Sequence, residues 1–127
     1  MKSTNVLRGI PDQLPDELTE ILLTREDLRI ERIVSRGHTS PGDFWYDQQE
    51  TEWVVVLAGR ARLSFEEDGQ IIPLEAGDSL LIPAHTRHRV DWTDPDQDTI
   101  WLAVFYPETS KTASAGEDLQ IPSPERA

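Results

Sequence analysis

The chain has 127 residues, of which 37% are hydrophobic, and 24 Asp and Glu against 12 Lys and Arg leave a formal net charge of −12. A protein this acidic repels nucleic acid phosphates and anionic lipid, which argues against nucleic acid and membrane partners. The absence of cysteine excludes disulfides, thiolate zinc sites and cysteine nucleophiles, so any metal must be held by nitrogen and oxygen.

The length suits one domain with one hydrophobic core. We expect a domain over residues 16–107, an N-terminal arm over residues 1–15 and a disordered C-terminal tail over residues 108–127. The longest apolar runs, 53–58 and 100–106, are far too short to span a bilayer. The N-terminus lacks the apolar core of a signal peptide, and we therefore expect a cytoplasmic protein.

Short β-forming runs separated by turn signals fill the middle of the chain. Residues 16–23 fit either a short edge strand or a helical turn. Pro73 predicts that its strand lies at a sheet edge. The further strands are predicted at residues 28–35, 44–47, 52–58, 60–65, 70–74, 79–82, 88–92 and 99–106. This spacing, without a long amphipathic helix, predicts an all-β antiparallel sandwich or barrel.

The strand at residues 52–58 is apolar on both faces after its first residue, Glu52. Alternation places Glu52 on the same face as Val54 and Val56, pointing inward. A carboxylate that faces an apolar interior is costly unless it is paired or bound to a cation. The opposite face of this strand carries Trp53, Val55 and Leu57. This apolar outer face predicts a homodimer formed by sheet packing, and the alternative is that the N-terminal arm covers it.

Two of the three histidines, His85 and His88, follow the apolar run 79–82 and Pro83. A strand that ends in proline and is followed by His-x-x-His presents imidazoles at a loop, where functional groups tend to lie. His88 shares its strand face with Val90 and Trp92, so the regular alternation points all three inward.

Two stretches carry a family resemblance. Glu52-Trp-Val-Val-Val-Leu-Ala-Gly59 resembles the end of the first cupin motif, and Gly77-Asp-Ser-Leu-Leu-Ile-Pro-Ala-His-Thr-Arg-His88 resembles the second. The chain is similar to small single-domain cupins of the RmlC-like superfamily, and residues 44–48 and 83–90 resemble a bacterial group of them. The resemblance implies an antiparallel double-stranded jelly-roll β-barrel whose mouth commonly holds a divalent metal.

The chain departs from the cupin motifs at the expected ligands. The first motif usually supplies two histidines before its glutamate. Those places fall on Tyr46 and Gln48 or, if the turn is one residue longer, on Trp45 and Asp47. In the second motif, His85 stands where glycine is usual.

The remaining polar residues predict a mixed nitrogen and oxygen site suited to Fe(II), Mn(II), Ni(II) or Zn(II). Glu52 has two interpretations, as a ligand or as the hydrogen-bonded partner of His88. His85 is a ligand, a loop cap or a proton shuttle at the mouth. Asp47 and Gln48 compete for one inward position. The predicted metal ligands are Asp47, Glu52, His85 and His88, and the predicted pocket residues are Tyr46, Gln48 and Trp92.

Two hypotheses about function follow. The first is a metal-dependent enzyme acting on a small molecule, a dioxygenase or an isomerase, with the metal as Lewis acid. The second is a cupin that binds or senses a small ligand without a functional metal, which the missing histidines of the first motif favour.

Overall fold

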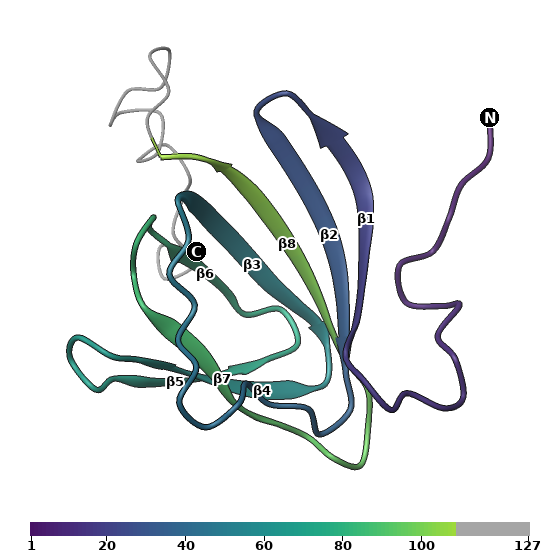
Figure 1. The fold of residues 1–127 in the computed structure, drawn as a ribbon. Helices are drawn as coiled ribbons and strands as arrows, with labels where there is room; N and C mark the ends of the chain where they lie inside the picture. The colour runs from purple at the N-terminus through teal and green to yellow at the C-terminus, as the bar shows by residue number, and fades with distance from the viewer. Residues whose placement is uncertain (109–127) are drawn as a thin grey trace, which may run out of the picture.

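A computed structural model describes residues 1–108 of the chain (Figure 1). The expected C-terminal tail therefore lies outside the described residues, except for Glu108. The strands are β1 (Leu18–Arg25), β2 (Leu28–Ser35), β3 (Glu50–Ala58), β4 (Arg60–Phe65), β5 (Ile71–Glu75), β6 (Ser79–Ile82), β7 (His88–Thr93) and β8 (Thr99–Pro107). Within residues 1–108, no helix is long and apolar enough to cross a membrane.

The strands form two antiparallel sheets that face each other. One sheet has five strands in the order β1-β2-β8-β3-β6, and the other has three in the order β5-β4-β7 (Figure 1). The two sheets converge at one end and diverge at the other, and the strands within residues 1–108 do not form a closed hydrogen-bonded ring. The predicted all-β jelly-roll fold is confirmed.

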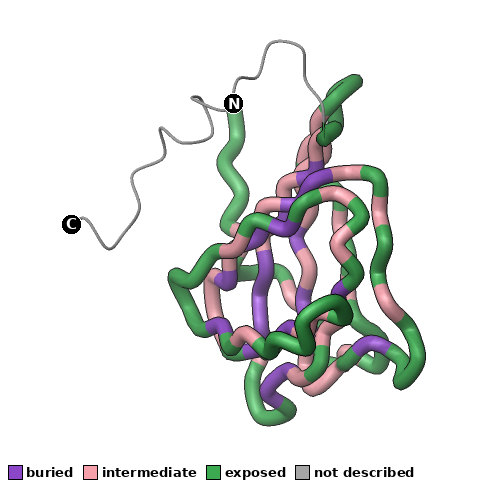
Figure 2. The backbone as a smooth tube through the Cα atoms, turned by 90° about the vertical axis from the view of Figure 1, so that its left-hand side faces the viewer, coloured by how far each residue is buried: buried purple, intermediate pink, exposed green. Residues whose placement is uncertain are grey.

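The hydrophobic core lies between the two sheets, and Figure 2 shows the buried stretches on the strands and the exposed ones mainly in the connections. Strand alternation supplies it, because every second residue of each strand points inward. The buried core residues are Val54, Val56, Ala61, Leu63, Leu74, Ile82, Trp101, Ala103 and Phe105.

The chain passes from the large sheet to the small one at Gly59, between β3 and β4. Gly59 has a φ of +84°, and a Cβ there would lie 2.5 Å from the carbonyl oxygen of Asp98. Only glycine meets both conditions without strain. This one-residue connection fixes the position of β4 relative to β3, and both strands line the site.

The structure resolves two open strand predictions and overturns one. The segment 16–23 forms a strand from Leu18 onward rather than a helical turn, and Pro73 lies on the edge strand β5, as predicted. The predicted strand 44–47 is wrong, because only Tyr46 makes a bridge, to His88. A turn closed by the N–H of Phe44 on the carbonyl of Pro41, at 3.0 Å, interrupts the pairing with β7 between Ser40 and Tyr46.

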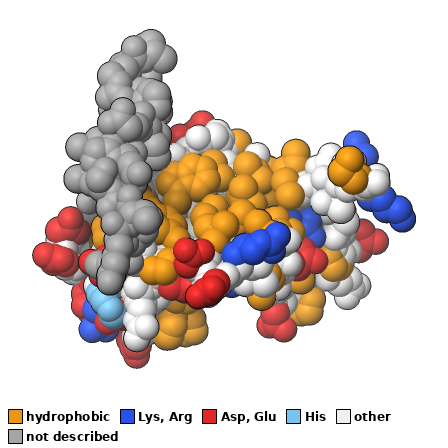
Figure 3. All heavy atoms as spheres, turned by 90° about the horizontal axis from the view of Figure 1, so that it is seen from above, with side chains coloured by type: hydrophobic (Ala, Val, Ile, Leu, Met, Phe, Trp, Pro, Cys, Tyr) orange, Lys and Arg blue, Asp and Glu red, His pale blue; other side chains and the backbone are white. Residues whose placement is uncertain are grey.

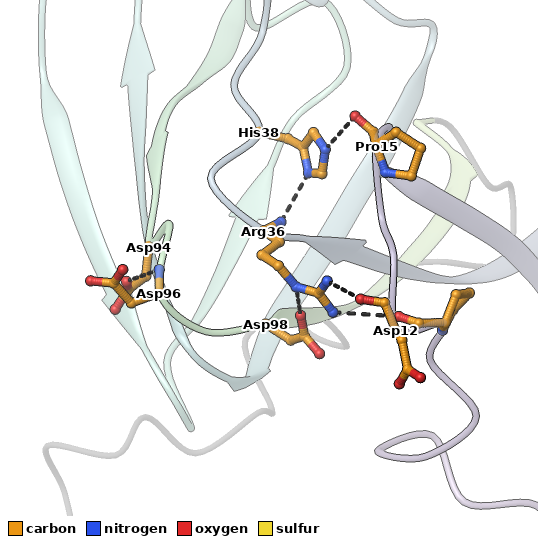
Figure 4. Close-up of polar contacts among 8 residues, drawn as sticks. Asp12, Pro15, Arg36, His38, Asp94, Asp96 and Asp98 are labelled. Carbon is orange, nitrogen blue, oxygen red and sulfur yellow. Dashed lines mark hydrogen bonds and ion pairs between the residues drawn. The ribbon is translucent and has the colours of Figure 1, made fainter.

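The N-terminal arm is bound to the domain by arginines that donate to its backbone carbonyls. Arg32, only 5% exposed, donates to the carbonyls of Val6 (3.1 Å) and Arg8 (2.6 Å). Further along, Arg36 donates to the carbonyl of Asp12 at 2.8 Å and to the carboxylate of Asp98 at 2.6 Å (Figure 4).

His38 completes this anchor. Its Nδ1 accepts the backbone N–H of Arg36 at 2.9 Å, so its Nε2 carries the proton that is donated to the Pro15 carbonyl at 3.0 Å (Figure 4). His38 therefore fixes the join between the arm and β1.

The outer face of the five-stranded sheet carries apolar side chains. Seen from above, hydrophobic side chains gather on this side of the molecule (Figure 3). Trp53, Val55 and Leu57 are half-buried, while Leu81 on the neighbouring β6 is 48% exposed. The arm lies on the far side of β1 from these strands (Figure 1), so it does not provide the alternative cover.

Candidate functional site

A cavity of about 210 Å³ lies between the two sheets. Its exposed lining residues mark the mouth, and its buried ones mark the floor. The lining consists of Glu17, Thr19, Glu31, Ile33, Tyr46, Gln48, Glu52, Val54, Leu63, Ile82, His88, Val90, Trp101 and Phe105.

Glu52 is the buried acid of this cavity. It is 9% exposed on β3, and its Oε1 accepts a hydrogen bond of 3.1 Å from the side-chain amide of Gln48. Burial raises the pKa of Glu52 to about 7, and the hydrogen bond from Gln48 opposes that rise only in part. Near neutral pH, Glu52 therefore exists in both its charged and its neutral form.

His88 lies beside Glu52 at the start of β7 and is 4% exposed. Its Nδ1 is 2.7 Å from the carbonyl oxygen of Thr86. Because a carbonyl can only accept, Nδ1 carries the proton and Nε2 of the neutral ring is an acceptor. Burial lowers the pKa of His88 and keeps the ring neutral, while Nε2 lies 3.8 Å from Glu52 Oε1.

Tyr46 forms a wall of the cavity. Its ring stacks on that of His88 with centroids 5.5 Å apart, and the two backbones exchange hydrogen bonds of 2.7 and 3.1 Å. The segment before it is bound to β7, because Arg89 donates to the carbonyls of Gly42 and Ser40 at 2.7 and 2.8 Å. Arg89 thus positions the Tyr46 segment.

The structure resolves the competition between Asp47 and Gln48. Gln48 points into the cavity toward Glu52, while Asp47 points to His85, with Oδ1 and Nδ1 2.9 Å apart. Both members of that second pair are exposed. His85 also donates its backbone N–H to the carbonyl of Gln48 at 2.8 Å, so it braces the turn that carries the cavity amide.

The backbone of His85 explains why glycine is usual at this place in the motif. Its φ is +59°, and no other non-glycine residue among those described has a positive φ. The left-handed conformation costs an L-residue roughly 1–2 kcal/mol. The side-chain bond to Asp47 and the backbone bond to Gln48 offset this cost.

The expected inward orientation of Trp92 is wrong. In the pairing of β7 with β4, Val90 lies opposite Leu63 and Trp92 lies opposite Arg62, which leaves Asp91 as an extra, bulged residue. One extra residue reverses the alternation. Trp92 therefore leaves the cavity and packs on the outer surface under the guanidinium of Arg62, 4.8 Å from the ring centroid.

The four predicted metal ligands lie in two pairs, one buried (Glu52 and His88) and one exposed (Asp47 and His85). Among residues 1–108, no three His, Asp or Glu side chains lie close enough together to hold a metal ion. A non-haem iron site of the facial kind needs two imidazoles and a carboxylate. The described residues do not fit such a site.

Sequence reasoning missed two acidic residues of the lining, Glu17 and Glu31. Glu31 alternates with apolar residues in β2, which is also the pattern of a strand exposed on one face, so the sequence holds no signal that separates the two cases. The Glu31 face points into the cavity because the arm binds the Arg32 face of the same strand.

Chemically, the buried pair can hold and transfer a proton. A carboxyl group whose pKa is about 7 gives up and regains its proton at neutral pH, as a general acid or base requires. The neutral imidazole of His88 offers a second acceptor from the opposite sheet. Apolar and aromatic walls surround both groups, as in small-molecule sites.

Comparison with known proteins places this geometry in a family. The model of the cupin domain family matches residues 32–105. A Ralstonia eutropha protein named a "putative mannose-6-phosphate isomerase" is 45% identical, with a TM-score of 0.80 over 84% of this chain and 99% of that one. No curated protein matches the chain.

Two more distant structures share the fold alone. An RmlC-like cupin from Desulfovibrio desulfuricans is 23% identical with a TM-score of 0.67, over 84% of this chain and 97% of that one. An RmlC-like cupin with a double-stranded β-helix from Methanocaldococcus jannaschii is 17% identical with a TM-score of 0.61, over 79% and 88%. The jelly-roll topology, the family match over most of the strands and the 45% identical relative lead to one conclusion: this chain belongs to the cupin domain family.

Proposed function

We propose that this cupin binds a small organic molecule in the cavity between its sheets, without a metal held by three or more protein ligands. The observation that carries this proposal is the buried pair of Glu52 and His88 beside Gln48, at one point of a cavity whose deeper walls are apolar and aromatic side chains. A few polar groups in an apolar hollow are typical of small-molecule sites. A volume of about 210 Å³ limits the ligand to about one ring with its substituents.

The name of the R. eutropha relative suggests a phosphorylated sugar, but the lining of this cavity does not favour one. Phosphate is recognised by Arg, Lys and backbone N–H groups. No Lys or Arg is among the lining residues of this cavity, whereas Glu17, Glu31 and Glu52 are. A phosphate there would face carboxylates without a cationic side chain to pair with.

The proposal is tested with uncharged one-ring probes such as benzyl alcohol. Titration should shift the methyl NMR signals of Val54, Leu63 and Val90, which line the cavity. Thr19→Trp, at the exposed mouth, should block the shifts. Ile21→Trp is the matched control, because Ile21 is exposed on the same strand but does not line the cavity. A panel that leaves these signals unmoved, or shifts that persist in T19W, would refute the proposal.

A metal-dependent enzyme is the second candidate, because Glu52 and His88 do supply one carboxylate and one imidazole at a single point. The bound molecule and water would then have to supply the remaining ligands. Elemental analysis of protein purified without added metal separates the two. Stoichiometric Fe, Mn, Ni or Zn that is lost in His88→Ala would favour the metal-dependent enzyme over the metal-free binding protein.

A further inference from the structure

Two hydrogen-bond acceptors converge on the cavity from opposite sheets. Nε2 of His88 is an acceptor because Nδ1 donates to Thr86, and the carboxylate of Glu52 accepts when it is ionised. Their atoms are 3.8 Å apart, too far for a hydrogen bond between them. Among residues 1–108, no donor lies within hydrogen-bonding distance of Nε2, although His88 is 4% exposed. This acceptor, on a side chain that lines the cavity, is left for a ligand.

The charge of the lining has one sign. Glu17, Glu31 and Glu52 line the cavity, and no Lys or Arg does. The nearby cation Arg29 is already paired with Glu31 at 2.6 Å and with Glu50 at 2.9 Å. Counting Arg29 together with all four of these carboxylates still leaves an excess of negative charge.

The walls add aromatic rings, one of which, Phe105, already has the guanidinium of Arg29 4.3 Å from its ring centroid. Tyr46, Trp101 and Phe105 line the same cavity. Aromatic faces attract cations, and the attraction grows where the cation is out of water. Carboxylates and aromatic rings around one hollow are therefore complementary to a positively charged group.

We infer that the molecule bound in this cavity carries an amino group that donates to both Glu52 and His88. This inference rests on the proposed function and narrows it to a class of ligand. An ammonium group has several N–H donors and no acceptor, so it can satisfy both acceptors at once. A hydroxyl has one donor and can satisfy only one of them, and a carboxylate would be repelled.

The test uses four probes with the same ring: benzylamine, benzyl alcohol, benzoate and benzyltrimethylammonium. Calorimetric or NMR titration is carried out at pH 8 and low salt in an amine-free buffer, so that Glu52 is ionised. Benzylamine should bind about tenfold more tightly than benzyl alcohol, because hydrogen bonds between charged groups are stronger than neutral ones. Benzoate should bind most weakly, and the quaternary ammonium, which lacks N–H donors, should bind less tightly than benzylamine.

Glu52→Gln keeps an oxygen acceptor for Gln48, removes the charge and replaces the second oxygen with an NH2 donor. E52Q should lower the affinity for benzylamine about tenfold and change the affinity for benzyl alcohol by less than about twofold. Glu50→Gln is the matched control for net charge, because Glu50 is on the same strand and pairs with Arg29 without lining the cavity. It should weaken the binding of benzylamine less than E52Q does and leave the binding of benzyl alcohol unchanged.

The outcomes separate this inference from the proposed function. If benzyl alcohol shifts the cavity methyl signals but benzylamine binds no better, only the amine inference is overturned. Only the amine inference is overturned, too, if E52Q and E50Q weaken the binding of benzylamine equally. If no probe reaches the cavity, the proposed function itself is overturned together with the inference.

Discussion

Two side chains, Glu52 and His88, define the chemistry of the cavity, and burial shifts the pKa of both. Burial makes the proton of Glu52 hard to lose, and the carbonyl of Thr86 fixes the tautomer of His88. The sequence indicates both residues, because Glu52 begins an apolar strand and His88 stands at the motif position. It cannot show the distance between them or the exposure that shifts the pKa, since both depend on how the two sheets pack.

The burial of Glu52 predicts a dependence of stability on pH. Its native pKa of about 7 lies above the ordinary 4.5, so between these values the native state holds a proton that the unfolded chain has released. The free energy of unfolding should therefore fall as pH rises through this window, by up to about 3 kcal/mol in total. Denaturant unfolding should show that the free energy of unfolding of E52Q rises relative to that of the wild type between pH 5 and pH 8.

The lowered pKa of His88 has the opposite effect on the free energy of unfolding. Below pH 6.5, the ordinary pKa of histidine, the imidazole of the unfolded chain binds a proton that the native ring does not bind. Comparing E52Q with the wild type at each pH cancels this contribution, since His88 is present in both. A difference in unfolding free energy that stays constant with pH would contradict the assigned role of Glu52.

The positive φ of His85 predicts different effects for two substitutions. His85→Ala loses the bond to Asp47 and keeps a strained backbone, whereas His85→Gly loses the same bond and relieves the strain. H85G should be more stable than H85A by about 1 kcal/mol in denaturant unfolding. Equal stabilities would show that the backbone at this position is not strained.

At the scale of elements, the sequence predicted the strands of the sheets better than the segments between them. Strands β2 to β8 follow runs of β-forming residues with turn signals on both sides, which is why their places are recognisable. The segment at 44–47 has the same composition, yet it makes a single bridge at Tyr46. Its position depends on Arg89 and Ser40, contacts across about fifty residues that no local pattern contains.

Arg89 should therefore matter more than its apparent surface position suggests. Arg89→Met removes two hydrogen bonds to backbone carbonyls and should cost about 1.5–3 kcal/mol. Hydrogen exchange at the Tyr46 amide should become faster. Arg87→Met is the matched control, because Arg87 makes only an exposed ion pair with Glu66, typically worth no more than about 1 kcal/mol. Equal losses in the two variants would argue against the positioning role.

At the scale of the whole molecule, the five-stranded sheet has one face toward the cavity and an apolar face outward. Trp53, Val55 and Leu57 are only half-buried there, and the arm lies elsewhere on the sheet. We propose that a second copy of the chain covers this face. An apolar interface of this kind offsets the mutual repulsion expected between two copies that each carry a formal charge of −12.

Sedimentation or solution scattering tests this association. The wild type should have the mass of a dimer, and Val55→Glu should reduce it to that of a monomer. Ile71→Glu is the control, because Ile71 is 56% exposed on the small sheet. A wild-type monomer at high protein concentration would refute the proposed dimer.

The bulge at Asp91 divides β7 into two halves, and the alternation of inward and outward side chains is shifted by one residue between them. Before the bulge, the side chains of His88 and Val90 line the cavity. After it, Thr93 is the inward residue, opposite Ala61. Asp91 itself occupies no place in the ladder. A chain shortened by that one residue would still set Val90 against Leu63 and Trp92 against Arg62, as an ordinary strand. The shape of the cavity thus tolerates a change of length at Asp91, whereas losing a residue between His88 and Val90 would turn one of these two side chains outward.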